Sequence, residues 1–210
     1  MEEEKKVIIV ATDGGADIVS WKPYVANTAA CIIVREYTYN DKAYTLTNEI
    51  KKSLYLPNST HNVAELTSYG MGMDFILESA IPETIPVVFV LDSEYTRKAI
   101  NIWYNHWIKT EVEGIAYRRL WKSNKYIPVK NWDLIKMIRA KYDELDASPR
   151  YVLAMHVHSH IKSYKEQEKE RLEIAQTQQL EISQNFFKLL LQANIDVDAL
   201  CTQCVKENKK

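Results

Sequence analysis

Residues 7-VIIVATDGGAD-17 decide the fold, because a continuous apolar run ends there in a carboxylate followed by two glycines. A strand that is apolar at every position is typical of one buried on both faces of a sheet. The pattern returns at 87-VVFVLD-92, so two buried strands are expected to end in Asp13 and Asp92. Ligands gather at strand ends in α/β sheets, and we expect these two carboxylates to be neighbours there.

The remaining elements predict an α/β fold with a mixed sheet. Residues 29–39 and 42–50 are rich in β-branched and aromatic side chains and flank the turn-like Asn40-Asp41, which predicts a hairpin. Helical spacing of apolar residues predicts helices around Leu66–Ile76, over 93–109 and over 130–145, and 151–157 is typical of a further strand. The order βββαβααβα favours a sheet flanked by helices.

Composition restricts the classes of protein. The 210 residues are 46% hydrophobic and 26% charged, which suits one compact domain, and the net charge of -1 gives no global field for nucleic acid. No apolar run approaches the roughly 18 residues of a membrane span or resembles a signal peptide, so we expect a soluble intracellular protein. Cys31, Cys201 and Cys204 are too few for a disulfide framework, and the lone C-x-x-C lacks the second pair that zinc needs.

Two segments have unusual amino-acid compositions. Residues 163–193 are polar but keep apolar positions at helical spacing, which predicts an amphipathic helix that packs on the domain, with pairing to a partner helix as the alternative. Residues 110–128 interleave cations with aromatic residues and predict an irregular basic segment.

A third acid is expected beside the two strand-end aspartates. Glu65 precedes the first residue of the buried helical stripe and can face the sheet edge. Clustered carboxylates repel one another unless a cation neutralises them, and their hard oxygens are what Mg²⁺ or Mn²⁺ requires. Each acid alone is more often a capping or first-turn residue, so spacing by itself does not decide.

Four segments, in order, resemble the bacterial and eukaryotic ribonuclease H family. They are 12-TDGGA-16, 60-THNVAEL-66, 92-DSEYTRKAINIWYNHWIK-109 and 129-VKNWDL-134. The resemblance implies a ribonuclease H-like fold with a five-stranded mixed sheet flanked by helices. It implies a single domain over 1–210, with a core at about 7–160 and 194–205 and a helical insertion at 161–193.

The activity implied by the resemblance is endonucleolytic cleavage of the RNA strand of an RNA/DNA hybrid with two Mg²⁺ or Mn²⁺ ions. Products would carry 5′-phosphate and 3′-hydroxyl ends. Asp13, Glu65 and Asp92 would be three metal ligands. For the fourth, 194-NIDVDALC-201 resembles the family's final motif and favours Asp198, whereas Glu170 matches in spacing alone. His160 would take the position of a loop histidine that assists product release or proton transfer.

The resemblance also implies a set of substrate contacts along the groove for the hybrid. Thr60 and Asn62 match positions that touch the DNA phosphate and the RNA minor groove, and the helix of 93–109 and the basic segment match a substrate-handling region. Trp103 and Trp107 are one helical turn apart, so one of them is expected in the core. The full set of expected substrate-binding residues is Gly14, Thr60, Asn62, Trp103, Trp107, Lys109, Arg118, Arg119, Lys122 and Asn194.

The chain also departs from the family pattern. The loop 16-ADIVSWKPYVAN-27 has no glycine where the family's first loop is glycine-rich, and glycines are missing around His160. His156 and His158 alternate with His160 on one strand face, where a structural role is favoured over zinc. Two other functions stay open: a structure-selective DNA nuclease on the same fold, and a hybrid-binding module without catalysis.

Overall fold

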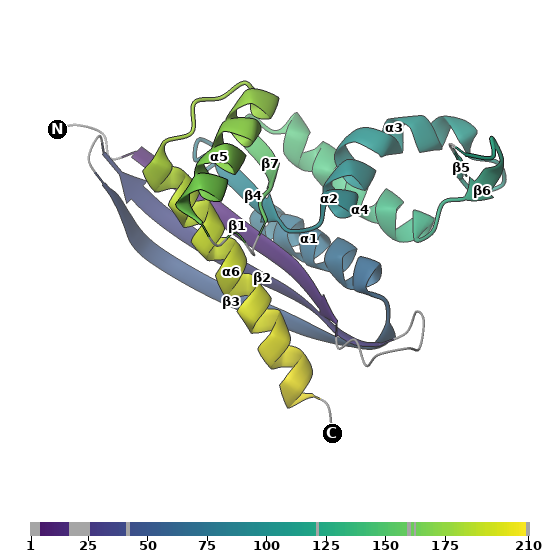
Figure 1. The fold of residues 1–210 in the computed structure, drawn as a ribbon, viewed down its shortest axis with the longest axis horizontal. Helices are drawn as coiled ribbons and strands as arrows, with labels where there is room; N and C mark the ends of the chain where they lie inside the picture. Colours follow the sequence, from purple (N-terminus) through teal and green to yellow (C-terminus); the bar gives the residue numbers. More distant parts are fainter. Residues whose placement is uncertain are drawn as a thin grey trace.

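A five-stranded mixed sheet forms the centre of the molecule and confirms the expected fold class. The computed structural model describes residues 5–16, 26–40, 43–120, 122–158, 161 and 163–208. The strand order is β3-β2-β1-β4-β7 (Figure 1). β1 pairs antiparallel with β2, and β2 with β3, whereas β4 runs parallel to both β1 and β7. The strands are β1 (Lys5–Ala16), β2 (Ala26–Tyr39), β3 (Tyr44–Ser59), β4 (Val87–Leu91) and β7 (Val152–His156).

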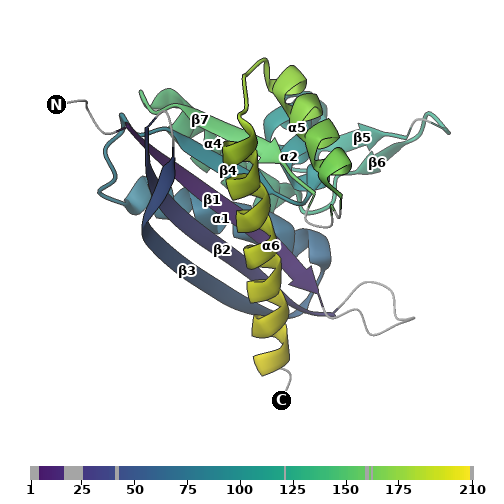
Figure 2. The same cartoon turned by 60° about the vertical axis from the view of Figure 1, so that its left-hand side comes forward.

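Helices cover both faces of this sheet, which explains why residues 7–11 of β1 form a continuous apolar run. Ile8 and Val10 point into a core shared with α1 (His61–Glu78) and α4 (Trp132–Ala147). Val7, Ile9 and Ala11 point into the opposite core, which α6 (Gln184–Glu207) closes. Figure 2 shows α6 crossing the sheet on the face opposite α1. Each side chain of the run is therefore buried on one side or the other.

The expectation that the first strand ends at Asp13 is wrong. β1 continues to Ala16, because its antiparallel pairing with β2 runs through Gly15 opposite Ala29. Its parallel pairing with β4 stops at Thr12 opposite Leu91. Asp13 therefore lies one residue beyond the β4 ladder, level with Asp92, which directly follows β4.

The two glycines after Asp13 serve close packing rather than a turn. A Cβ atom on Gly14 would lie 2.2 Å from the backbone nitrogen of Glu65, and one on Gly15 would lie 2.7 Å from Cβ of Cys201. Side chains at these positions would push α1 and α6 away from the end of β1. The glycines thus let both helices approach the sheet beside Asp13.

The segment between β4 and α4 is more ordered than the sequence predicts. The helix expected over 93–109 is a chain of short helical pieces with a wide π turn in the middle. The basic segment after it contains a two-stranded hairpin that projects from the body (Figure 1). The pieces are α2 (Glu94–Lys98), η1 (Ala99–Trp103), α3 (Tyr104–Trp107), η2 (Ile108–Thr110), β5 (Tyr117–Arg119) and β6 (Tyr126–Pro128).

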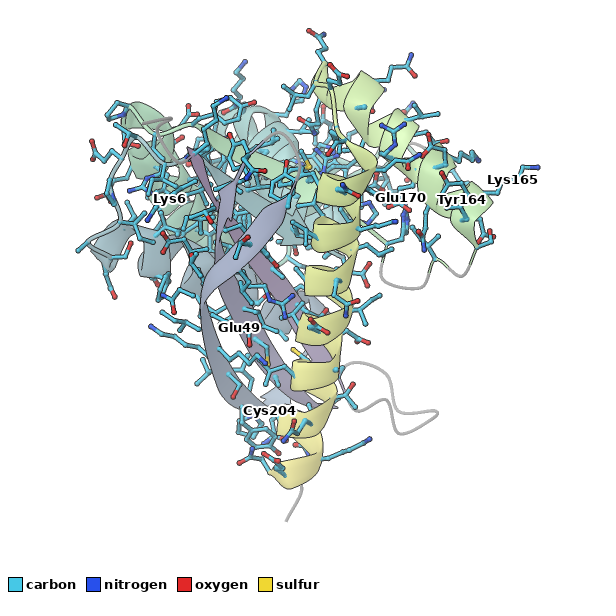
Figure 3. All side chains as sticks on the ribbon, turned by 90° about the vertical axis from the view of Figure 1, so that its left-hand side faces the viewer. Lys6, Glu49, Tyr164, Lys165, Glu170 and Cys204 are labelled. Carbon is cyan, nitrogen blue, oxygen red and sulfur yellow. The ribbon has the colours of Figure 1, made fainter. Side chains whose placement is uncertain are left out.

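The single helix expected over 163–193 is two helices. α5 (Tyr164–Gln178) ends because Gln179 adopts the left-handed conformation, and α6 begins after the cap Ser183. None of the described residues of α5 is fully buried, whereas α6 runs through 193 into the segment that resembles the family's final helix. Figure 3 shows α5 beside one end of α6, with Glu170 on α5 and Cys204 toward the other end of α6.

An ion-pair network ties α6 to the sheet. The buried guanidinium of Arg35 on β2 contacts Glu49 at 2.7 Å and Asp196 at 2.6 Å. Cys201 and Cys204 lie on α6 as expected, and all three cysteines are buried free thiols. Among the described residues, no helix is both long and apolar enough to cross a membrane.

Candidate active site

Four carboxylates from four separate elements share one end of the sheet. Asp13 comes from β1, Glu65 from α1, Asp92 from the residue after β4, and Asp198 from α6. The charges of Asp92 and Asp198 raise the pKa of both Asp13 and Glu65, so the four groups lie within electrostatic reach of one another. Tertiary structure therefore assembles the acids that the sequence singled out.

Burial is the largest cause of the raised pKa values of the two innermost acids, Asp13 and Glu65. Asp13 is 5% exposed and Glu65 is 3% exposed. Burial, reinforced by the neighbouring carboxylates, raises the pKa of Asp13 to about 6, although hydrogen bonding to Cys201 and to the backbone of Gly14 opposes the rise. Burial raises the pKa of Glu65 well above its ordinary value for the same reasons. Both groups are costly to ionise without a cation.

The donor set fits divalent cations. Oδ2 of Asp13 and Oε2 of Glu65 are buried and have no hydrogen-bond partner among the described residues. Buried carboxylate oxygens are normally satisfied, so two such atoms in one acidic cluster indicate a place for a cation. Within the described ranges, no three His, Cys, Asp or Glu side chains already stand at ligand spacing, so ion binding requires the side chains to draw closer.

Local sequence explains how two of the acids are held. The side chain of Thr60 accepts from the backbone nitrogen of Val63 at 3.2 Å and starts α1, which places Glu65 in its second turn. Ser93 caps α2 by accepting from Thr96, so the chain turns immediately after Asp92. Nε2 of His156 lies 2.8 Å from the backbone oxygen of Asp92 and ties the end of β4 to β7.

The two candidates for the fourth acid have different surroundings. Glu170 on α5 accepts from the backbone nitrogen of His158 at 2.8 Å and contacts its Nδ1 at 3.0 Å. The charge of Asp198 adds to the effect of burial in raising the pKa of Asp13 and of Glu65, whereas the carboxylate of Glu170 is engaged by His158. This arrangement favours Asp198. His160 lies outside the described residues.

Asn194 was expected to touch the substrate, but the structure buries it. Its side chain is 1% exposed, and Nδ2 donates to the backbone oxygen of Val157 at 2.5 Å. The residue therefore holds the chain leaving β7 against α6. Gly14 is also buried, and the space for a side chain there is filled by the backbone of α1.

The expected substrate-binding residues on the surface fall in two places. Asn62 is exposed and Thr60 half-buried at the start of α1, beside the acids. Lys109, Arg118, Arg119 and Lys122 are exposed on and before the β5–β6 hairpin. Trp107 is buried and packs against the half-buried Trp103 at 5.4 Å between ring centroids, which confirms that one of the two tryptophans belongs to the core.

Two residues near the acids were missed by the sequence analysis. His61 lies with Nε2 at 3.3 Å from Oε1 of Glu65, and its position one helical turn before Glu65 could have indicated this. Cys201 donates from Sγ to the backbone oxygen of Asp13 at 3.2 Å. No local signal places Cys201 there, because the contact joins residues at opposite ends of the chain.

The sheet order, the helices on both faces and the acids at one sheet end define the ribonuclease H-like class of fold. Solved structures with a similar fold support this assignment. A prototype foamy virus protease–reverse transcriptase matches 97% of this chain and 21% of its own length, with a TM-score of 0.54 and 21% identity. LC9-RNase H1, described as a type 1 RNase H with the type 2 active-site motif, matches 93% of this chain and 87% of its own, with a TM-score of 0.54 and 16% identity.

Two proteins with related sequences are named ribonuclease H or HI. A protein named Ribonuclease H from Granulibacter bethesdensis is 27% identical over 151 residues, which cover 72% of this chain and 78% of the relative. A protein named Ribonuclease HI from Streptomyces coelicolor is 31% identical over 102 residues, which cover 49% of this chain and 38% of the relative. No protein-family profile matches this chain. The relatives confirm the resemblance and identify the chain as a homologue of enzymes named ribonuclease H.

Proposed function

We propose that this protein is a ribonuclease H that hydrolyses the RNA strand of RNA/DNA hybrids, leaving 5′-phosphate and 3′-hydroxyl ends. The observation that carries the proposal is the cluster of four acids from four elements, with an unpartnered, buried oxygen on Asp13 and on Glu65 among the described residues. Homology to proteins named ribonuclease H supports the nuclease class, and the acids support metal-dependent hydrolysis.

Asp13, Glu65, Asp92 and Asp198 would hold two divalent ions, Mg²⁺ or Mn²⁺. When bound, such a pair supplies water activation and stabilisation of the leaving oxygen. The chain's own contribution is to fix the ligands. Asp13 is held in β1 by pairing with Cys31 of β2, and the backbone of Asp92 is held by His156. Rigid elements keep the carboxylates close despite their repulsion.

Hybrid binding would use the exposed polar and basic surface. Thr60 would contact a phosphate of the DNA strand and Asn62 the minor groove of the RNA strand, and Arg118, Arg119 and Lys122 would neutralise phosphates of the duplex. A foamy virus protease–reverse transcriptase with this fold has been solved in complex with an RNA/DNA hybrid, at a TM-score of 0.56. On this proposal His160 assists product release or proton transfer.

We propose that the chain is one domain, in which residues 161–193 form a helical insertion that carries α5 and the first turns of α6. Free buried thiols suit a reducing, intracellular compartment. Protein partners could meet the exposed surface of α5, whose Tyr164 and Leu172 are more than half exposed.

Cleavage of a labelled RNA/DNA hybrid with Mg²⁺ or Mn²⁺ tests the proposal. We expect Asp92→Asn to abolish cleavage, whereas Asp133→Asn, which changes an acid whose side chain is 92% exposed on α4, should cleave like wild type. Equal cleavage by the two variants would point to a contaminating nuclease. Cutting of four-way junction DNA in place of the hybrid would assign a resolvase-like nuclease. Tight hybrid binding without cleavage would assign a binding module.

A further inference from the structure

His61 opens α1 at the rim of the acidic cluster. Its Nε2 atom lies 3.3 Å from Oε1 of Glu65, one helical turn further along. The His61 side chain is 55% exposed, whereas that of Glu65 is 4% exposed. The imidazole therefore lies between the buried carboxylates and the solvent from which a cation arrives.

The spacing of these two atoms suits ligands of a common ion. Two donor atoms that each lie about 2.1 Å from an ion, at right angles, are about 3 Å apart. The other oxygen of Glu65, Oε2, has no partner among the residues described. Asp92 directly follows β4, at the end of the sheet where Glu65 lies.

We infer that His61 is a nitrogen ligand of a divalent ion held with Glu65 and Asp92, and that it makes this site favour Mn²⁺ over Mg²⁺. The inference rests on the proposed function, which supplies the carboxylate ligands. Mg²⁺ takes oxygen ligands and keeps several waters, whereas first-row transition ions accept imidazole nitrogen. The carboxylates alone give no such preference.

Binding of Mn²⁺ to the metal-free full-length chain, without nucleic acid, tests the inference. Pulsed electron paramagnetic resonance should detect ¹⁴N coupling to Mn²⁺ in wild type and lose it in His61→Ala. The matched control is His106→Ala, which removes an exposed histidine on α3 and should keep the coupling. His61→Ala should weaken Mn²⁺ binding about tenfold or more, and Mg²⁺ binding less than about threefold.

Several outcomes would overturn the inference while leaving the proposed function in place. One is nitrogen coupling that survives in His61→Ala. Another is a loss of affinity in His61→Ala that is equal for Mn²⁺ and Mg²⁺. A third is unchanged Mn²⁺ binding in His61→Ala, while Asp92→Asn has lost Mn²⁺ binding. Retained Mn²⁺ affinity with weakened hybrid binding would instead assign His61 to substrate contact. A wild-type chain that binds no Mn²⁺ and cuts no hybrid would overturn both.

Discussion

Replacing Asp13 with asparagine should stabilise the metal-free protein while abolishing cleavage. Asp13 is buried, and its pKa is raised from an ordinary 3.8 to about 6. A carboxyl whose pKa is higher in the fold than in the unfolded chain favours folding only while it is protonated. That stability is present below about pH 4 and is lost as the pH rises through 6. At pH 8 the ionised group therefore opposes folding.

The expected size follows from the same two values. At 1.36 kcal/mol for each pKa unit, the difference between 3.8 and about 6 corresponds to about 3 kcal/mol above pH 7. Asparagine carries no charge but still leaves a buried polar group without a partner, so we expect Asp13→Asn to gain about 1–3 kcal/mol at pH 8. The gain should fall to about half at pH 5, where the wild-type carboxyl is mostly protonated.

Urea unfolding in the presence of a chelator, at pH 8 and at pH 5, measures this gain. Asp133→Asn is the control, because the side chain of Asp133 is 92% exposed and its replacement should change the free energy of unfolding little. Saturating Mn²⁺ should stabilise wild type more than Asp13→Asn and reduce the difference. Two results would refute the claim that ionised Asp13 destabilises the fold. One is an Asp13→Asn variant no more stable than wild type at pH 8, and the other is a gain in the free energy of unfolding that is the same at pH 8 and pH 5.

Three other changes follow from specific contacts. Gly15→Ala should destabilise the protein by about 1–3 kcal/mol in urea unfolding, because the new Cβ would lie 2.7 Å from that of Cys201; unchanged stability would contradict this. Asp198→Asn should lower kcat on the hybrid about a hundredfold or more, whereas the kcat of Glu170→Gln should stay within about threefold of wild type. The reverse ranking would make Glu170 the ligand. The double change Arg118→Ala and Arg119→Ala should raise KM about tenfold at unchanged kcat and reduce the salt slope of binding by about 2. A loss confined to kcat would show that these arginines act in the chemistry.

Patterns that repeat within a few residues were reliable guides to the fold. The apolar runs 7–10 and 87–91 predicted two strands buried on both faces, and both are central strands of the sheet. The stripe from Leu66 to Ile76 predicted α1, whose inward face it forms. Such patterns work because burial acts on each element through its own period.

Backbone conformation at single residues was harder to predict. Gln179 takes a left-handed conformation that only glycine and asparagine commonly signal, so the break between α5 and α6 had no visible marker. The π turn in 99–103 and the hairpin in the basic segment also lack a strong local signature. The π turn buries Ala99 and Ile100 against the body, whereas β5 and β6 pair with each other in a hairpin that projects from it.

The sequence by itself determined the class of sheet and the resemblance to ribonuclease H, and it nominated Asp13, Glu65 and Asp92, whose roles stay predictions. Only the tertiary structure decided which acids share an electrostatic neighbourhood, since α6 brings Asp198 to them while α5 turns Glu170 toward His158. It also decided that the glycines after Asp13 admit two helices instead of forming a turn. The physical reason is that a local pattern fixes which face of an element is buried, whereas contacts between distant segments depend on how the elements pack.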